Sequence, residues 1–138
     1  MTPVFDHEKL KVYRQAVAFV AWCDEIMQRC PDKAAVKDQF DRASTSIPLN
    51  IAEGNGKWSS RDRCRFLDIA RGSAVECAAC LDVLVAKKRL TADDVEPGKK
   101  QLYEIVSMLV GLIQSVSSRV GEEPAVYAVE GEQEQEQE

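Results

Sequence analysis

The stretch SIPLNIAEGNG, residues 46–56, places a proline inside a helical pattern. Apolar side chains keep the three- and four-residue steps of one helix face on both sides of Pro48, at Phe40, Ala43, Ile47 and Ile51. Pro48 cannot donate a hydrogen bond to the carbonyl of Ser44 and crowds it, which costs about 3 kcal/mol or kinks a helix. We therefore expect one helix that is kinked at Pro48.

The residues around this kink allow two interpretations. Hydroxyl groups at Ser44, Thr45 and Ser46 can bond to nearby carbonyls and so support a bent turn. Gly54 and Gly56 are expected to end the helix in the left-handed conformation. In the structural interpretation, the bend and the turn are held by Ser46, Pro48, Asn50, Glu53 and Gly54. In the functional interpretation, the bend forms a polar corner that binds a ligand through Arg42, Asn50 and Glu53.

Apolar periodicity predicts four helices, over residues 7–30, 33–53, 59–89 and 91–120. Asp6 is the expected N-cap of the first helix, and Pro31 should end that helix. Ser59 and Thr91 should cap the third and fourth helices, each with an aspartate three residues later as in a capping box. Short connections and the lack of an alternating strand pattern predict an all-α fold, an antiparallel up-down-up-down four-helix bundle.

Three helices besides the kinked one show an apolar face that should point into the core. On the first helix this face is Val12, Ala16, Phe19, Cys23, Ile26 and Cys30. On the third helix it is Phe66, Ala70, Ser73, Cys77, Leu81 and Leu84. On the fourth helix it is Leu102, Ile105, Leu109, Leu112 and Val116.

The first and fourth helices carry a second apolar stripe beside the first. On the first helix this stripe is Leu10, Tyr13, Val17, Val20 and Met27. On the fourth helix it is Tyr103, Val106, Val110, Ile113 and Val120. Such wide apolar surfaces favour packing between subunits in a homo-oligomer. The alternative is a broad core-facing surface in a monomer.

Charge divides the 138-residue chain into two predicted parts. The net charge is −5, yet residues 122–138 hold seven acids and no base, which leaves sixteen acids and eighteen bases in residues 1–121. We expect a bundle domain over 1–121 and a disordered acidic Glu/Gln tail over 122–138. The tail is either a solvated solubility segment or a competitor that masks a basic face.

The sequence also predicts a compartment. The longest apolar run, residues 105–113, is too short to span a bilayer, so no membrane segment is expected. The N-terminus has no basic stretch followed by an apolar one, which favours the cytoplasm. We expect the five cysteines to be buried, reduced thiols.

Residues 42–76, RASTSIPLNIAEGNGKWSSRDRCRFLDIARGSAVE, carry a family signature. They resemble the pattern R-A-x-x-S-I-P-x-N-I-A-E-G, followed by a basic residue, serines, F-L-x-I-A-x-G-S and a glutamate. Residues 5–17, FDHEKLKVYRQAV, are similar to the opening of the first helix in the same family. The chain thus resembles, over about residues 5–118, the four-helix bundle proteins first recognised as products of intervening sequences in bacterial large-subunit ribosomal RNA genes.

This resemblance implies a bundle that assembles as a ring-like homopentamer, with no established catalytic role. A distant branch with this fold is the accessory protein of diversity-generating retroelements, where a basic pentamer partners a reverse transcriptase and nucleic acid. The resemblance therefore implies two classes of partner, other copies of the chain and an RNA- or DNA-handling complex.

The residues themselves offer little for catalysis or for a cofactor. His7, the single histidine, has no identifiable acid–base partner. The cysteine spacing lacks the second close pair or the histidines that zinc needs. Gly54 and Gly56 are not followed by the Lys-Ser or Lys-Thr pair of a phosphate-binding loop. We expect no catalytic residue, no metal and no cofactor.

The best binding candidate is a basic surface at the start of the third helix. Lys57, Arg61 and Arg65 recur at four-residue steps, and Trp58 offers a ring that can stack on a base. With Arg42, these residues are the candidate nucleic-acid contacts; the alternative is a solvated face whose arginines pair with Asp62 and Asp68. The leading hypothesis is a non-enzymatic homo-oligomeric scaffold. The alternative is a nucleic-acid-binding accessory protein.

Overall fold

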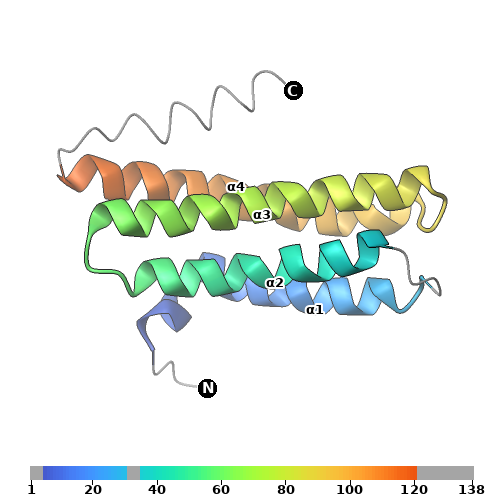
Figure 1. Cartoon of the computed structure of the whole chain (residues 1–138), viewed down its shortest axis with the longest axis horizontal. Coiled ribbons are helices and arrows are strands. Elements are labelled where there is room, and N and C mark those ends of the chain that lie inside the picture. Colours follow the sequence, from blue (N-terminus) through green and yellow to red (C-terminus); the bar gives the residue numbers. More distant parts are fainter. Residues whose placement is uncertain (1–4, 31–34, 121–138) are drawn as a thin grey trace.

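The computed structural model describes residues 5–30 and 35–120 and confirms the all-α prediction for them. A short 3-10 turn, η1 (Asp6–Lys9), precedes four α-helices (Figure 1). These are α1 (Lys11–Met27), α2 (Ala35–Asn55), α3 (Ser60–Ala86) and α4 (Ala92–Val120), and the described ranges contain no strand. The predicted acidic tail, 122–138, and Pro31 lie outside the described residues. The first helix was expected to run to residue 30, but α1 ends at Met27 and is followed by a turn.

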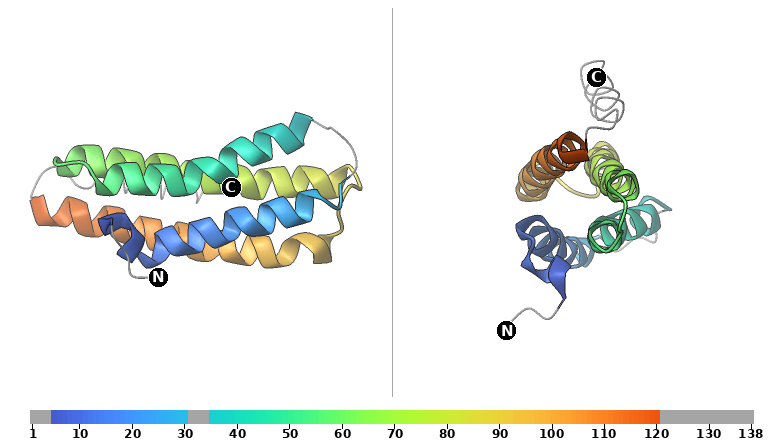
Figure 2. Two further views of the ribbon diagram at one scale, coloured as in Figure 1. Left: turned by 90° about the horizontal axis from the view of Figure 1, so that it is seen from below. Right: turned by 90° about the vertical axis from the view of Figure 1, so that its left-hand side faces the viewer.

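Each helix packs against its neighbours in the chain, and α1 also packs against α4. Seen end-on in Figure 2, the four helices surround a common centre. The most extensive contact is the one between α2 and α3. The core is built from aliphatic, aromatic and cysteine side chains of all four helices, and its largest fully buried members are Phe19, Phe40, Ile47, Ile51, Leu81, Leu84, Ile105 and Leu109.

The beginning of the first helix differs from the prediction. Asp6 does not cap it, because η1 occupies residues 6–9 and α1 begins only at Lys11 after an extended Leu10. Asp6 instead accepts a hydrogen bond from Asn55 Nδ2 at 2.9 Å, which ties the 3-10 turn to the end of α2. The core face of α1 is confirmed at Val12, Ala16, Phe19, Cys23 and Ile26.

Helix α2 continues through Pro48, as predicted, and Figure 2 shows it changing direction along its length. Ser44 is almost fully buried near the bend, and its hydroxyl donates to the carbonyl of Asp41 at 3.0 Å. The predicted stop by left-handed glycines is wrong. Gly54 lies inside the helix and is buried, and Gly56, which follows the helix end at Asn55, does not have a left-handed backbone either. A Cβ at Gly54 would come within 2.9 Å of Phe66 Cβ, so this glycine permits close contact between α2 and α3.

The inward face of α3 is partly different from the predicted one. Phe66 and Ser73 are only half-buried and lie toward α2, since Ser73 Oγ is 2.8 Å from Ser46 Oγ. The buried face is Cys64, Leu67, Ala70, Ala74, Cys77, Cys80, Leu81 and Leu84. On α4, Ile113 takes the core position that was assigned to Leu112.

Both second stripes are mainly covered within the protomer. On the first helix, Leu10 at the N-cap, Tyr13 and Met27 are half-buried against the core, and Val17 is well exposed. On α4, Ile113 is buried and Val106 packs against the core, whereas Tyr103 is 75% exposed. Among the described side chains, each stripe therefore leaves one member well exposed, Val17 on α1 and Tyr103 on α4.

Among the described helices, none has a stretch long and apolar enough to cross a membrane.

Candidate functional site

The predicted binding residues gather where α2 passes into α3. We call Lys57, Trp58, Arg61 and Arg65 the basic corner. Ser59 N-caps α3, and its hydroxyl accepts from the Asp62 amide at 3.1 Å as predicted. Trp58, one residue earlier, is fully exposed, with a relative accessibility of 102%. The cap fixes where the helix begins and leaves the indole in solvent.

The aromatic ring of Phe66 organises two cations of the basic corner. Lys57 Nζ lies 5.1 Å and Arg65 Cζ lies 5.4 Å from the centre of this ring. Lys57 also pairs with Glu53 at 3.5 Å, and Arg65 pairs with Asp62 at 3.5 Å. Both ion pairs are exposed, and surface pairs of this kind contribute about 0–1 kcal/mol. Glu53 and Asp62 therefore hold Lys57 and Arg65 only weakly.

Two other arginines do not join this surface. Arg71 pairs with Asp68 at 2.9 Å, as predicted, but its side chain is only 11% exposed. Arg42 is exposed on α2, about three and a half turns before the end of that helix at Asn55. The structure therefore supports Lys57, Trp58, Arg61 and Arg65 as one group and separates Arg42 from it.

Two residues of the polar corner predicted around the bend, Asn50 and Glu53, have partners within the protein. Asn50 Nδ2 donates to the carbonyl of Ser46 at 2.8 Å and to its hydroxyl at 2.9 Å. The same Ser46 hydroxyl lies 2.8 Å from that of Ser73 in α3. Asn50 thus supports Ser46 from within α2, Ser46 contacts α3, and Glu53 pairs with Lys57.

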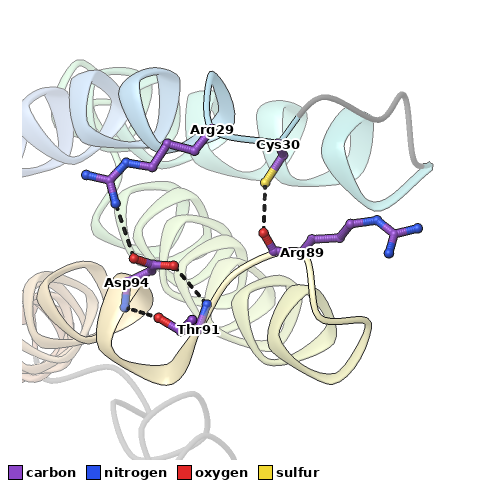
Figure 3. A network of polar contacts seen from close by, with 5 residues as sticks. All are labelled: Arg29, Cys30, Arg89, Thr91 and Asp94. Atoms are coloured by element: carbon purple, nitrogen blue, oxygen red, sulfur yellow. Dashed lines mark hydrogen bonds and ion pairs between the residues drawn. The ribbon is translucent and has the colours of Figure 1, made fainter.

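A second polar network lies at the opposite end of α3 (Figure 3). Thr91 and Asp94 form the predicted capping box, with the Thr91 amide donating at 2.9 Å and the Asp94 amide donating at 3.1 Å. Arg29, in the turn that follows α1, pairs with Asp94 at 3.2 Å. The two hydrogen bonds from Thr91 lower the pKa of Asp94, and the charge of Arg29 adds to this. This network connects α1 to the start of α4.

The sequence matches the family described as 23S rRNA-intervening sequence protein over residues 8–111. The chain belongs to this family. It is also similar to a crystal structure of a protein with unknown function from the S23 ribosomal protein family of Bacteroides thetaiotaomicron VPI-5482, with a TM-score of 0.69 and 23% identity. The similarity covers 73% of this chain and 96% of that one, and at this identity it shows a shared fold. No curated protein matches the chain.

In this member of the intervening sequence family, the signature residues hold two helices together. Ser46 and Ser73 join two helices by a hydrogen bond, Asn50 supports Ser46 from within its helix, and Gly54 allows those helices to approach. Pro48 lies at the buried side of the same helix. The structural interpretation of the signature is therefore the one that the contacts support.

The five cysteines are buried and unpaired with one another, as predicted. Burial raises the pKa of the Cys23 thiol to about 12, against the smaller lowering effect of a hydrogen bond with Ser44. Burial also raises the pKa values of Cys77 and Cys80. These thiols stay protonated and unreactive near neutral pH. Among the residues described, no three His, Cys, Asp or Glu side chains gather as a metal site requires.

His7 and Phe66 are the residues whose surroundings sequence reasoning did not foresee. His7 lies in η1, half-buried, and its ring meets Tyr13 edge-on at 4.7 Å. Phe66 was assigned to the core, yet it supports the cations of the basic corner. No spacing in the sequence indicated this contact, because adjacent residues of a helix do not face each other.

Proposed function

We propose that this member of the intervening sequence family is a non-enzymatic helical scaffold that assembles from copies of itself. In this proposal each protomer has its helices in antiparallel up-down-up-down order, and the copies form a ring, the pentamer that the family resemblance implies. The observation that carries the proposal is Tyr103, a large aromatic side chain in the middle of the bundle that is 75% exposed.

Tyr103 belongs to a larger apolar surface. Val106 and Val110 follow it on the same side of α4 and are half-buried. Two contacts set the register of α4 against α3. Lys99 pairs with Asp82 at one end, and Ser117 lies next to Cys64 at the other. This register brings Val75 of α3, which is 36% exposed, level with Val106.

An apolar stripe that crosses two helices suits a protein partner more than solvent. Tyrosine is favoured at such interfaces because its ring buries a large apolar area while its hydroxyl keeps a polar contact. Apolar area removed from water contributes about 25 cal/mol per Å². The surface that we propose to be shared between protomers is therefore Val75, Tyr103, Val106 and Val110.

Solution mass tests the proposal. Light scattering on the native protein should give a multiple of the 15.4 kDa protomer, and Tyr103→Lys should shift the population toward the protomer. Thr45→Lys is a matched control, because it adds the same charge at an exposed position of α2. A native protein that remains at 15.4 kDa at high concentration would refute self-assembly, and equal effects of the two substitutions would refute this interface.

Nucleic-acid binding is the second candidate function, favoured by the fully exposed Trp58 beside the cations of the basic corner. In this role the protein would be an accessory factor for ribosomal RNA or for a reverse transcriptase. Stacking of one base on an aromatic ring contributes about 1–3 kcal/mol. Trp58→Ala should weaken binding of single-stranded RNA about tenfold or more, while Leu49→Ala, at another exposed apolar position, should leave it unchanged.

Gel shifts at increasing salt measure this second function. Contacts to phosphates make the affinity fall steeply as salt rises. The test includes the native protein and a variant whose tail glutamates are replaced by glutamine. If neither protein retards the RNA at low salt, nucleic-acid binding is excluded.

A further inference from the structure

We infer that the acidic segment 122–138 docks on the basic corner of its own chain, with residues 122–130 as the contact. This interaction goes beyond the proposed scaffold and does not depend on self-assembly. It concerns Lys57, Trp58, Arg61 and Arg65, the surface that a polyanion would also use.

The first argument is where the segment leaves the fold. Ser117, in the last turn of α4, lies 3.3 Å from the Sγ atom of Cys64 in the second turn of α3. The carbonyl of Ile113 also accepts from Cys64 at 3.8 Å. In Figure 1 the end of α4 and the α2–α3 connection lie at the same end of the molecule. Residue 122 therefore follows directly after a helix end that borders the basic corner.

The second argument is reach. An extended chain advances about 3.3 Å per residue, so a few residues suffice to bring the first glutamates to the corner. Another group of bases, Lys87, Lys88 and Arg89, lies at the far end of α3. The 27 residues of this helix separate the two groups by about 40 Å. The near group therefore meets the segment at much higher effective concentration.

The third argument is chemical complementarity. Residues 122–130 read EEPAVYAVE, so acids flank a short apolar stretch that contains Tyr127. The corner has the matching pattern, with Trp58 fully exposed among cations. Glutamates of the segment can replace Glu53 and Asp62 as partners of Lys57 and Arg65, because those exposed pairs are weak. Tyr127 can then cover part of the Trp58 ring, which removes apolar surface from water.

Nuclear magnetic resonance of the full-length chain tests the inference through its two indole signals. Trp58 reports on the corner, and Trp22, half-buried between α1 and α4, is an internal reference. The triple variant E122Q, E123Q and E130Q should shift the Trp58 signal and the amides of residues 57–66. High salt should shift the native protein in the same direction, because it screens the contact. Trp22 should not move.

A second triple variant is the matched control. E134Q, E136Q and E138Q remove the same three charges from the distal part of the segment. This variant should keep the native Trp58 signal. Equal shifts in the two variants would show a general effect of net charge, and no shift in the proximal variant would show no docking; either result overturns the inference.

Mixing identifies the chain that supplies the segment. The labelled proximal variant is refolded with an excess of unlabelled native protein. The variant signal should persist, because its own segment no longer binds and the native segments occupy their own corners. Recovery of the native Trp58 signal would assign the contact to a second copy and overturn docking within one chain.

Discussion

Gly98 of α4 faces the indole ring of Trp22 in α1 so closely that a Cβ atom at this position would overlap ring carbons Cη2 and Cζ3. Trp22 stacks on Phe19 with ring centres 5.8 Å apart, and Phe19 meets Phe40 of α2 edge-on at 6.4 Å. The glycine therefore allows α4 to approach an aromatic cluster that connects three helices.

Gly98→Ala should destabilise the protein although alanine is the better helix former. The gain in helix propensity is about 1 kcal/mol. The methyl group would force Trp22 out of its position, and overpacking of this kind costs about 1–3 kcal/mol or more. Denaturant unfolding should show a net loss of stability.

Gly72→Ala is the matched control for that substitution. Gly72 is an exposed residue inside α3, and a Cβ there would meet no atom within 4 Å. Alanine should therefore raise the free energy of unfolding by about 0.5–1 kcal/mol. If both variants gained stability, the close approach at Trp22 would not constrain the fold.

Lys88 gives the second prediction, because it adopts a left-handed backbone with φ of 59° after the end of α3. The Arg89 amide donates to the carbonyl of Leu84 at 2.9 Å, which is the hydrogen bond of a Schellman motif. Glycine is the residue that this position favours, since a left-handed conformation costs other residues about 1–2 kcal/mol. Lys88→Gly should raise the unfolding midpoint in urea.

Lys87→Gly provides the comparison within the same motif. Lys87 has a φ of −83°, which any residue adopts, so glycine there adds only freedom to the unfolded chain. This variant should lose up to about 1 kcal/mol. A loss of stability in Lys88→Gly as well would contradict the strain argument.

The helices and most of the core could be predicted from sequence, because their periodicity is a local property. The buried face of α3 was predicted less accurately. This helix packs extensively against both α2 and α4, so its buried surface is wide. Phe66 and Ser73 were assigned to the core for this reason. Gly54 was predicted to end α2 because glycine is common at helix ends. Glycine is also favoured where two helices approach closely, which is its role here, and the sequence does not distinguish the two.

The charged residues of the candidate site could be predicted from the sequence, but their contacts in space could not. Lys57, Arg61 and Arg65 recur visibly in the sequence, and the structure places them at one corner. The contact of Lys57 with Phe66 depends on the turn between α2 and α3, which spacing alone does not define. The separation of Arg42 likewise follows from its distance along α2.

The hydrogen bond between Ser46 and Ser73 gives the third prediction. Each serine to alanine substitution removes one member of a half-buried contact and leaves the other hydroxyl without this partner. Each should therefore cost about 1–3 kcal/mol, and the double variant should cost less than the sum. A double-mutant cycle should give a coupling energy of at least about 0.5 kcal/mol.

Thr45→Ala is the control for this cycle. Thr45 is an exposed hydroxyl residue of α2, next to Ser46 in the chain. Combined with Ser73→Ala, it should give additive effects within about 0.3–0.5 kcal/mol. A coupling of the same size with Thr45 would show that the α2–α3 contact does not pass through Ser46.

The buried thiol of Cys23 gives the last prediction, a loss of stability at high pH. Burial raises its pKa from 9.0 to about 12 in the folded protein. Between these values the unfolded chain has lost a proton that the folded chain retains, so the stabilisation is complete below pH 9 and declines above it. The free energy of unfolding should fall by about 1.4 kcal/mol per pH unit for this thiol.

Urea unfolding from below pH 9 to about pH 11 measures this slope, and Cys23→Ala should make it shallower by the contribution of one thiol. Ile26→Val is the control on the same buried face of α1. It should cost about 0.5–1.5 kcal/mol at every pH and leave the slope unchanged, because it removes no titrating group. A native slope equal to that of Cys23→Ala would mean that the thiol ionises as readily in the fold as outside it.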